Sequence, residues 1–149
     1  MNLKPYLLRF WNFWPPLFFS GIKIVKISPD FKYIKVRLKL RFWNANYVGT
    51  AFGGSIFAMT DAFYMVMLMK NLGPRYIVWD KAAEIRYVKP GKTDVLAEFV
   101  ITDEEIDNIK ELLKDSDKMD WIKPVQVIDK EGQLIADVKR IIYIKKKTG

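Results

Sequence analysis

The most regular hydrophobic pattern in the chain lies between residues 34 and 42, where apolar and basic side chains alternate. Because successive side chains of a strand point to opposite faces, this pattern predicts a half-buried strand with a cationic outer face. The apolar positions are Ile34, Val36, Leu38, Leu40 and Phe42, and the basic positions are Lys35, Arg37, Lys39 and Arg41. Another strand is predicted before it, over residues 22–27, and the turn sequence Ser28-Pro29-Asp30 joins the two.

A different pattern follows between Ala51 and Asn71, where apolar residues surround a predicted helix on every side instead of forming a stripe. Gly73-Pro74 ends this helix, because glycine caps a helix and proline does not continue it. A membrane-spanning helix would show the same pattern, but Asp61 in its middle and the strand-like flanks argue against one. Since one sheet cannot cover every side of such a helix, we expect a sheet that wraps around it or a partner subunit that covers the rest.

The remainder of the chain predicts four more strands and a short amphipathic helix, which together favour an α+β protein with a mostly antiparallel sheet. Thr102 and Glu105 form a capping box at the start of the short helix. Lys81 lies on the apolar face of its strand, which indicates a carboxylate partner, a cofactor contact or a bulge. The predicted strands are 76–88, 94–101, 121–128 and 133–144, and the predicted buried residues of the helix are Ile106, Ile109, Leu112 and Leu113.

The stretch Tyr6–Phe19 is rich in aromatic residues, but Pro15-Pro16 interrupts it and Arg9 adds a charge, so it is too short to span a bilayer. No small-residue cleavage site follows it, as a secretory signal would require. We therefore expect residues 1–20 to form a short helical extension packed on the domain, in preference to a peripheral membrane contact. With 149 residues, the chain has the size of a single domain, 1–149.

The chain contains no cysteine and no histidine, which excludes disulfides, zinc sites of the cysteine or histidine type, a Ser-His-Asp triad and a thiol nucleophile. Any acid or base must therefore be an Asp, Glu, Lys or Tyr side chain, and we expect no metal site. The lack of cysteine suits a cytoplasmic protein, which is the location we predict.

The net charge of +8 belongs to one end of the chain, because residues 1–43 hold nine Lys or Arg and a single acidic residue, Asp30. A cationic strand face suits nucleic acid or an anionic membrane. However, charged outer faces also keep sheets soluble, and no aromatic residue stands between the four charges as a stacking platform for a nucleic acid would. We therefore favour a solvated face, with no nucleic-acid partner.

The residues best suited to chemistry lie between Asn46 and Asp61. Gly53 and Gly54 open the predicted helix, where unpaired N–H groups and the helix dipole suit a carbonyl oxygen that gains negative charge. Asp61 follows Gly54 by seven residues, about two turns at ~3.6 residues each, so it returns to the same face. A carboxylate on an apolar helix is either a catalytic base or nucleophile, or half of a structural ion pair. Gly-Gly at a helix start also serves simple close packing against a strand.

The segment Asn46-Tyr-Val-Gly-Thr-Ala-Phe-Gly-Gly54, with Asp61 on the helix, resembles the motif of hotdog-fold thioesterases of the phenylacetyl-CoA thioesterase type. Three other segments make the chain still more similar to a largely uncharacterised bacterial hotdog family, and this likeness covers almost the whole chain. These segments are Ser28-Pro29-Asp30, Val78-Trp79-Asp80-Lys81 and Lys89-Pro90-Gly91. The resemblance implies an antiparallel sheet wrapped around a long central helix, in homodimers, or tetramers built from them, that join two sheets edge to edge around two sites.

The same resemblance implies hydrolysis of an acyl-CoA or a related acyl thioester. The N–H of Gly54, or of its neighbour Gly53, would polarise the thioester carbonyl. Asp61 would activate water or attack the acyl carbon, and Asn46 would help to hold water or substrate. Coenzyme A enters as part of the substrate, and no separate cofactor is expected.

One residue departs from the better-known enzymes of this type, because Phe52 stands where they have histidine before Gly-Gly. Phe52 and Ser55 are candidate substrate contacts, with ordinary core packing as the alternative for Phe52. Lys81, Lys89 and Lys92 are candidate contacts for coenzyme A, although turn lysines are commonly only solvated. The departure at Phe52 keeps a second function open, that of a catalytically weak hotdog protein that binds acyl-CoA or lipid.

Overall fold

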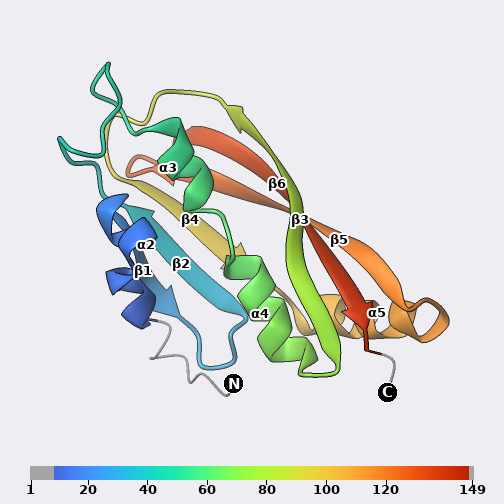
Figure 1. Cartoon of the computed structure of the whole chain (residues 1–149). Coiled ribbons are helices and arrows are strands. Elements are labelled where there is room, and N and C mark those ends of the chain that lie inside the picture. Colours follow the sequence, from blue (N-terminus) through green and yellow to red (C-terminus); the bar gives the residue numbers. More distant parts are fainter. Residues whose placement is uncertain (1–8, 148–149) are drawn as a thin grey trace.

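Six antiparallel strands form one sheet, and two helices run along one of its faces (Figure 1). The computed structural model describes residues 9–147. The strand order is β1-β2-β4-β5-β6-β3, so β1 and β3 are the two edges of the sheet. The strands are β1 (Ile22–Ile27), β2 (Tyr33–Leu38), β3 (Tyr76–Tyr87), β4 (Val95–Val100), β5 (Lys118–Asp129) and β6 (Leu134–Lys146). This arrangement confirms the α+β prediction and is the hotdog architecture that the resemblance implies.

The core lies between the sheet and the two helices on its face, and the predicted apolar face of β2 is completely buried there. However, β2 ends at Leu38, so the prediction that the strand extends to Phe42 is wrong. The backbone N–H of Leu40 donates a hydrogen bond to the side chain of Asp94 (3.1 Å) instead of to a neighbouring strand. The chain therefore leaves the sheet after Leu38, and Phe42 is 89% exposed.

The central helical segment is not the single helix that the sequence predicted between Ala51 and Asn71. It consists of α3 (Gly53–Ala58) and α4 (Phe63–Leu72), separated by residues 59–62. In the break, the Thr60 hydroxyl donates a hydrogen bond to the carbonyl oxygen of Phe57 (2.8 Å), and such side-chain bonds compete with helical hydrogen bonding. Ala62 then adopts a left-handed conformation with φ of 64°, which a right-handed helix cannot contain. Asp61 therefore lies in the break and not within a helix.

The sheet covers the central helices on one side only. Most of α4 is buried, including Phe63, Met67 and Leu68. Phe57 of α3 and Met69 of α4 remain partly exposed. The described part of one chain thus leaves apolar surface of the central helices uncovered, as the all-round apolar pattern led us to expect.

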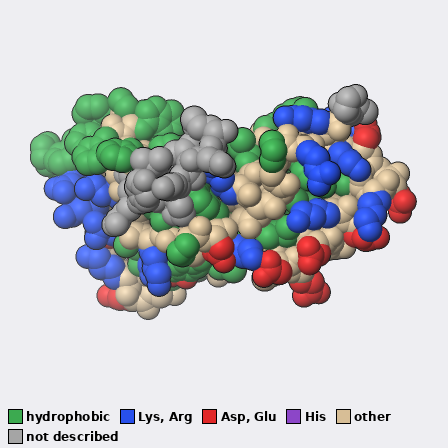
Figure 2. All heavy atoms as spheres, turned by 90° about the horizontal axis from the view of Figure 1, so that it is seen from below, with side chains coloured by type: hydrophobic (Ala, Val, Ile, Leu, Met, Phe, Trp, Pro, Cys, Tyr) green, Lys and Arg blue, Asp and Glu red, His purple; other side chains and the backbone are tan. Residues whose placement is uncertain are grey.

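Two short helical turns, η1 (Arg9–Phe13) and α2 (Pro15–Phe19), form the N-terminal extension and pack on β1. The side chain of Asn12 accepts a hydrogen bond from the N–H of Ile24 (2.7 Å) and donates one to its carbonyl oxygen (3.3 Å). Residues 1–8 of the predicted extension lie outside the described residues. The extension leaves several aromatic side chains exposed, and Figure 2 shows hydrophobic side chains gathered at one end of the molecule with Lys and Arg side chains beside them. Over residues 9–147, every helix is too short or too polar to span a membrane.

The helix α5 (Asp103–Asp115) begins with the predicted capping box, in which Thr102 and Glu105 exchange hydrogen bonds between side chain and backbone. Glu105 also forms an ion pair with Lys123 of β5. Burial acts to raise the pKa of Glu105, but the hydrogen bonds from Lys123 and Thr102 outweigh it, so this pKa lies below its ordinary value. The predicted inner face is confirmed except at Leu112, which is exposed.

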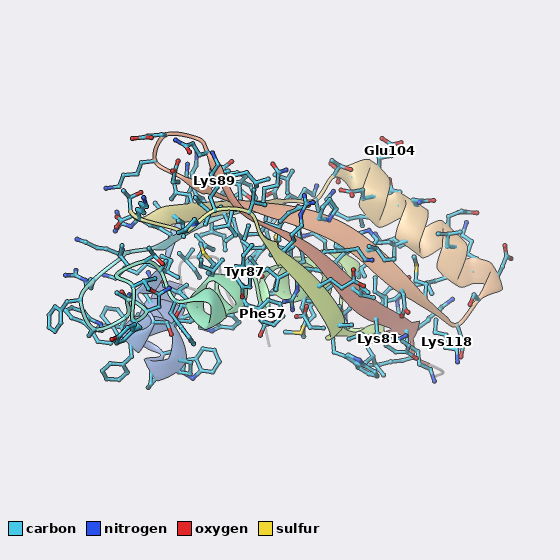
Figure 3. All side chains as sticks on the ribbon, turned by 90° about the horizontal axis from the view of Figure 1, so that it is seen from above. Phe57, Lys81, Tyr87, Lys89, Glu104 and Lys118 are labelled. Atoms are coloured by element: carbon cyan, nitrogen blue, oxygen red, sulfur yellow. The ribbon has the colours of Figure 1, made fainter. Side chains whose placement is uncertain are left out.

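We expect Glu105→Gln to lower the free energy of unfolding at pH 7 by about 0.5 kcal/mol, since glutamine preserves the cap but not the charge. A carboxyl with a lowered pKa in the folded state stabilises the protein above its ordinary pKa of 4.5 and loses this contribution as the pH falls. The difference between the variant and the parent should therefore disappear in urea unfolding at pH 3. Glu104→Gln, on the exposed side of the same helical turn (Figure 3), is the matched control. An equal loss in both variants would contradict the assignment.

Candidate functional site

Two hollows open beside the start of α3, and the predicted site residues are divided between them. The first has a volume of about 630 Å³ and contains Asn46, Gly53, Lys89 and Lys92 in its lining. The second has a volume of about 440 Å³ and contains Gly54, Asp61 and Lys81. Figure 3 shows the same separation, with Lys89 and Tyr87 toward one end of β3 and Lys81 toward the other. The start of α3, with Gly53 in one lining and Gly54 in the other, is the element that the two hollows share.

Tyr87, the last residue of β3, fixes the start of α3 in the first hollow. Its hydroxyl donates a hydrogen bond to the carbonyl oxygen of Gly53 (2.8 Å). Its ring lies so close that a Cβ atom at position 53 would be 3.1 Å from it. Gly53 therefore serves the close packing of helix against strand that we gave as the alternative explanation of Gly-Gly.

Phe52 lies over the next glycine on the other side. A Cβ atom at position 54 would be only 2.5 Å from the Phe52 ring, so this ring occupies the space that a side chain at Gly54 would need. Phe52 is 55% exposed and is not part of the core. The backbone N–H groups of Gly53 and Gly54 donate to no described residue, so both can still donate to a bound carbonyl oxygen.

The remaining predicted site residues differ in what their side chains contact. Asn46 holds its own loop, because its Oδ1 accepts from the N–H groups of Val48 (3.1 Å) and Thr50 (3.0 Å). Lys89 donates to the side-chain oxygen of Gln133 (3.1 Å), and Lys92 is exposed at the rim. Ser55 is buried within α3 and lines neither hollow.

The second hollow is organised by a buried arginine, Arg140 of β6. Its Nη2 atom donates to Asp61 Oδ1 (2.5 Å) and to Asp80 Oδ1 (2.6 Å). The arginine side chain is only 4% exposed, against 19% for Asp80 and 60% for Asp61. Its guanidinium carbon also lies 5.7 Å from the centre of the Phe57 ring. One cation from the sheet thus holds a carboxylate of β3 and a carboxylate of the helix break together.

Asp61 lies beside the same hollow as Gly54, as the spacing predicted, but it is exposed and is not part of a helix. The break between α3 and α4 turns it toward β3 and β6, where it is exposed and paired with Arg140. Only its Oδ1 atom is engaged among the described residues, so Oδ2 can accept a proton or a hydrogen bond from a molecule in the hollow. This geometry suits a fixed base at the edge of an open site.

Lys81 lies in a β-bulge, which is one of the three explanations that we gave for its position on the apolar face. The register between β3 and β6 shifts between Asp80 and Ala82, which leaves Lys81 as the extra residue. Its ammonium group pairs with Asp120 of β5 (2.6 Å), and its side chain is half exposed. The carboxylate partner is thus confirmed, in an accessible position instead of a buried one.

Arg140 and Asp80 were not among the predicted site residues. The signal that identifies Arg140 is the alternation in β6, where Ala136, Val138, Ile142 and Ile144 lie on the buried face at every second position. Arg140 falls on that face, which requires a partner for its charge. The sequence does not show that its partners come from β3 and from a helix break.

Several solved structures share this fold. A Pseudomonas aeruginosa protein of unknown function, named a probable thioesterase, matches with a TM-score of 0.81 and 20% identity over 99% of each chain. A protein of unknown function from Chlorobaculum tepidum matches with a TM-score of 0.74 and 17% identity, over 98% of this chain and 99% of that one. A thioesterase from Haemophilus influenzae matches with a TM-score of 0.68 and 11% identity, over 98% of this chain and 93% of that one. At these identities, the likeness establishes the fold.

No curated protein matches the sequence significantly. One family profile, described as a domain of unknown function, DUF4442, matches residues 6–144. This match agrees with the expected resemblance to an uncharacterised family, whereas the phenylacetyl-CoA type stays a prediction. Because the match spans nearly the whole chain, the protein belongs to the DUF4442 family.

Proposed function

We propose that the protein is a thioesterase that hydrolyses acyl-CoA, with Asp61 as its catalytic base. The observation that carries the proposal is the position of Asp61, whose Oδ1 is held by Arg140 and which lines the second hollow together with Gly54. A base and a backbone donor beside one opening are the two groups that hydrolysis of a thioester requires. The names of the similarly folded proteins from P. aeruginosa and H. influenzae support the same class of reaction.

In the proposed reaction, the N–H groups at the start of α3 donate to the thioester carbonyl oxygen. Asp61 accepts a proton from a water molecule, whose oxygen attacks the carbonyl carbon. The negative charge that develops on the carbonyl oxygen is stabilised by Gly54 or Gly53. When the intermediate collapses, the carbon–sulfur bond breaks, the acid is released, and the proton passes from Asp61 to the departing thiolate.

We assign the first hollow to the coenzyme A part of the substrate. Its volume of about 630 Å³ is in the range of small-molecule sites, and Lys89 and Lys92 add two cations to its rim. Ammonium groups of this kind bind phosphate oxygens. The substrate would then cross the start of α3, with the thioester carbonyl beside Gly54 and the acyl group in the second hollow.

The proposal includes a homodimer, because the second hollow lies beside β3, an edge strand of the sheet. The edge carries exposed Trp79, which stacks on Tyr143 of β6 with ring centres 4.4 Å apart. A second copy paired along β3 would cover this edge and the apolar surface of α3, and it would separate the second hollow from bulk solvent.

Replacing the proposed base tests the reaction directly. We expect Asp61→Asn to reduce kcat/KM by about 10²- to 10⁴-fold, because general-base catalysis contributes rates of this size. Release of free thiol from short, long and aryl acyl-CoA esters would be followed with a thiol-reactive dye, and the protein contributes no background because it has no cysteine. Asp107→Asn, an exposed carboxylate of α5, is the matched control. Equal turnover in both variants would exclude Asp61 as the base.

The position of Phe52 favours the second function, an acyl-CoA-binding protein with little turnover. Its ring lies against Gly54, beside the backbone donors that the reaction needs. If this ring limits access of the carbonyl, the parent protein will show a saturable increase in Tm with acyl-CoA but negligible thiol release. Phe52→His, which restores the residue expected from the resemblance, would then raise the rate.

Arg140 acts as a positioning residue for Asp61 and as the counterion of Asp80. We expect Arg140→Met to lower the free energy of unfolding by about 3 kcal/mol, because it leaves the largely buried Asp80 carboxylate without a cation. Urea unfolding at pH 7 measures this loss, and the double variant Arg140→Met/Asp80→Asn should recover part of it. An unchanged unfolding free energy in Arg140→Met, or no recovery in the double variant, would show that the charge pairing is not the stabilising feature.

A further inference from the structure

A third hollow, of about 670 Å³, lies at the β1 edge of the sheet, away from both hollows of the proposed site. We call it the basic aromatic hollow. Its basic lining residues are Lys23, Arg37, Lys39 and Arg41. Its aromatic lining residues are Phe18, Phe19 and Trp43. These residues come from α2, β1, β2 and the loop after β2, so the hollow exists only in the folded chain.

The cations of this hollow have no counterions among residues 9–147. Lys23 of β1 is the direct cross-strand partner of Arg37 of β2, and like charges in that position destabilise a sheet. Neither these two residues nor Lys39 and Arg41 form an ion pair with a described carboxylate. The Nε atom of Arg37 is buried and has no hydrogen-bond partner. A surface built in this way is stabilised when an anionic group binds to it.

Lys35, on the same face of β2, differs from the cations of the hollow because it has a counterion. Its ammonium group pairs with Glu98 of β4 (2.8 Å). The hydrogen bond raises the pKa of Lys35 and lowers that of Glu98. The solvated face that we favoured from the sequence holds for Lys39 and Arg41, which are exposed, whereas Arg37 is half-buried and Lys35 is paired with Glu98.

The aromatic residues around the hollow are exposed, although apolar rings of this size are usually buried. Phe18 and Phe19 project from α2, and Trp43 extends beside Phe42 in the loop after β2. The guanidinium group of Arg41 lies 5.0 Å from the Trp43 ring centre. In the sequence, no aromatic residue stands between the four charges, which argued against a binding face. In the folded protein, aromatic residues from other segments lie beside these charges.

We propose that the basic aromatic hollow docks the protein on an anionic phospholipid membrane. Charge complementarity carries the choice of partner, because lipid phosphates would neutralise the unpaired cations while the exposed rings enter the interfacial layer that aromatic side chains prefer. The space-filling view shows the required arrangement, with hydrophobic side chains clustered at one end and basic side chains directly beside them (Figure 2). The cations converge on one hollow instead of following a track, which disfavours the backbone of a nucleic acid.

Sedimentation with phospholipid vesicles tests the proposal. We expect the full chain to bind vesicles that contain about 30% phosphatidylglycerol and not vesicles of pure phosphatidylcholine, because an anionic surface attracts basic residues. Lys39→Glu/Arg41→Glu should weaken binding about 25-fold or more, because each basic residue near an anionic surface contributes about fivefold. Phe19→Ser/Trp43→Ser should weaken binding by at least about tenfold, since two exposed rings no longer enter the interface.

A charge-matched control separates this surface from the general positive charge of the protein. Lys118→Glu/Lys146→Glu makes the same change in net charge on exposed lysines of β5 and β6, and should bind vesicles almost as well as the parent. Tm measurements confirm that each variant is folded. Equal weakening by the control pair, or undiminished binding of the aromatic variant, would overturn the proposal.

Three further outcomes would also overturn it by identifying another partner. The first is saturable binding of inorganic phosphate or free coenzyme A that Lys39→Glu/Arg41→Glu abolishes, with no vesicle binding. The second is a dimer that Phe19→Ser/Trp43→Ser dissociates in analytical ultracentrifugation, which would assign the surface to a second copy of the chain. The third is tight binding of single-stranded DNA by the parent without vesicle binding. None of these measurements depends on thioester turnover, so the docking surface and the proposed reaction can fail separately.

Discussion

The buried guanidinium group of Arg140 connects the sheet to the break in the central helix. By donating from one nitrogen to both Asp61 and Asp80, it satisfies its own charge in the core and fixes two carboxylates from distant parts of the chain. Ala62 adopts a left-handed backbone conformation, which is unfavourable for a residue other than glycine. This conformation directs the chain so that Asp61 faces the sheet. The pairing acts together with the Thr60 hydrogen bond to Phe57 and the left-handed Ala62, which separate α3 from α4.

The start of α3 depends equally on close aromatic packing. Tyr87 lies against Gly53 and Phe52 lies against Gly54, so neither glycine can carry a side chain without a shift of its neighbour. This packing leaves two backbone N–H groups at the mouth of the hollows and determines how closely a carbonyl group can approach them. Under the proposed function, the space beside the Phe52 ring would decide between turnover and binding without turnover.

The two edges of the sheet differ in electrostatic character. Near β3, Arg140 and Lys81 are matched with carboxylates. At the β1 edge, the four cations of the basic aromatic hollow form no ion pair with a carboxylate of residues 9–147. Charges that are paired within the chain stabilise the fold. Unpaired cations beside exposed aromatic rings favour binding of an anionic partner.

The sequence by itself determined the α+β class, most of the strands and the capping box at Thr102 and Glu105, and it offered the bulge at Lys81 as one of three explanations. These features depend on residues close together in the chain, where the alternation of apolar positions and local hydrogen bonding decide the outcome. Only the tertiary structure decided that the helix breaks beside Asp61, that Arg140 is its partner, and that the predicted residues divide between two hollows. Those outcomes depend on contacts between β6, β3 and the helix break. The local sequence pattern does not show which charged residues far apart in the chain will form ion pairs.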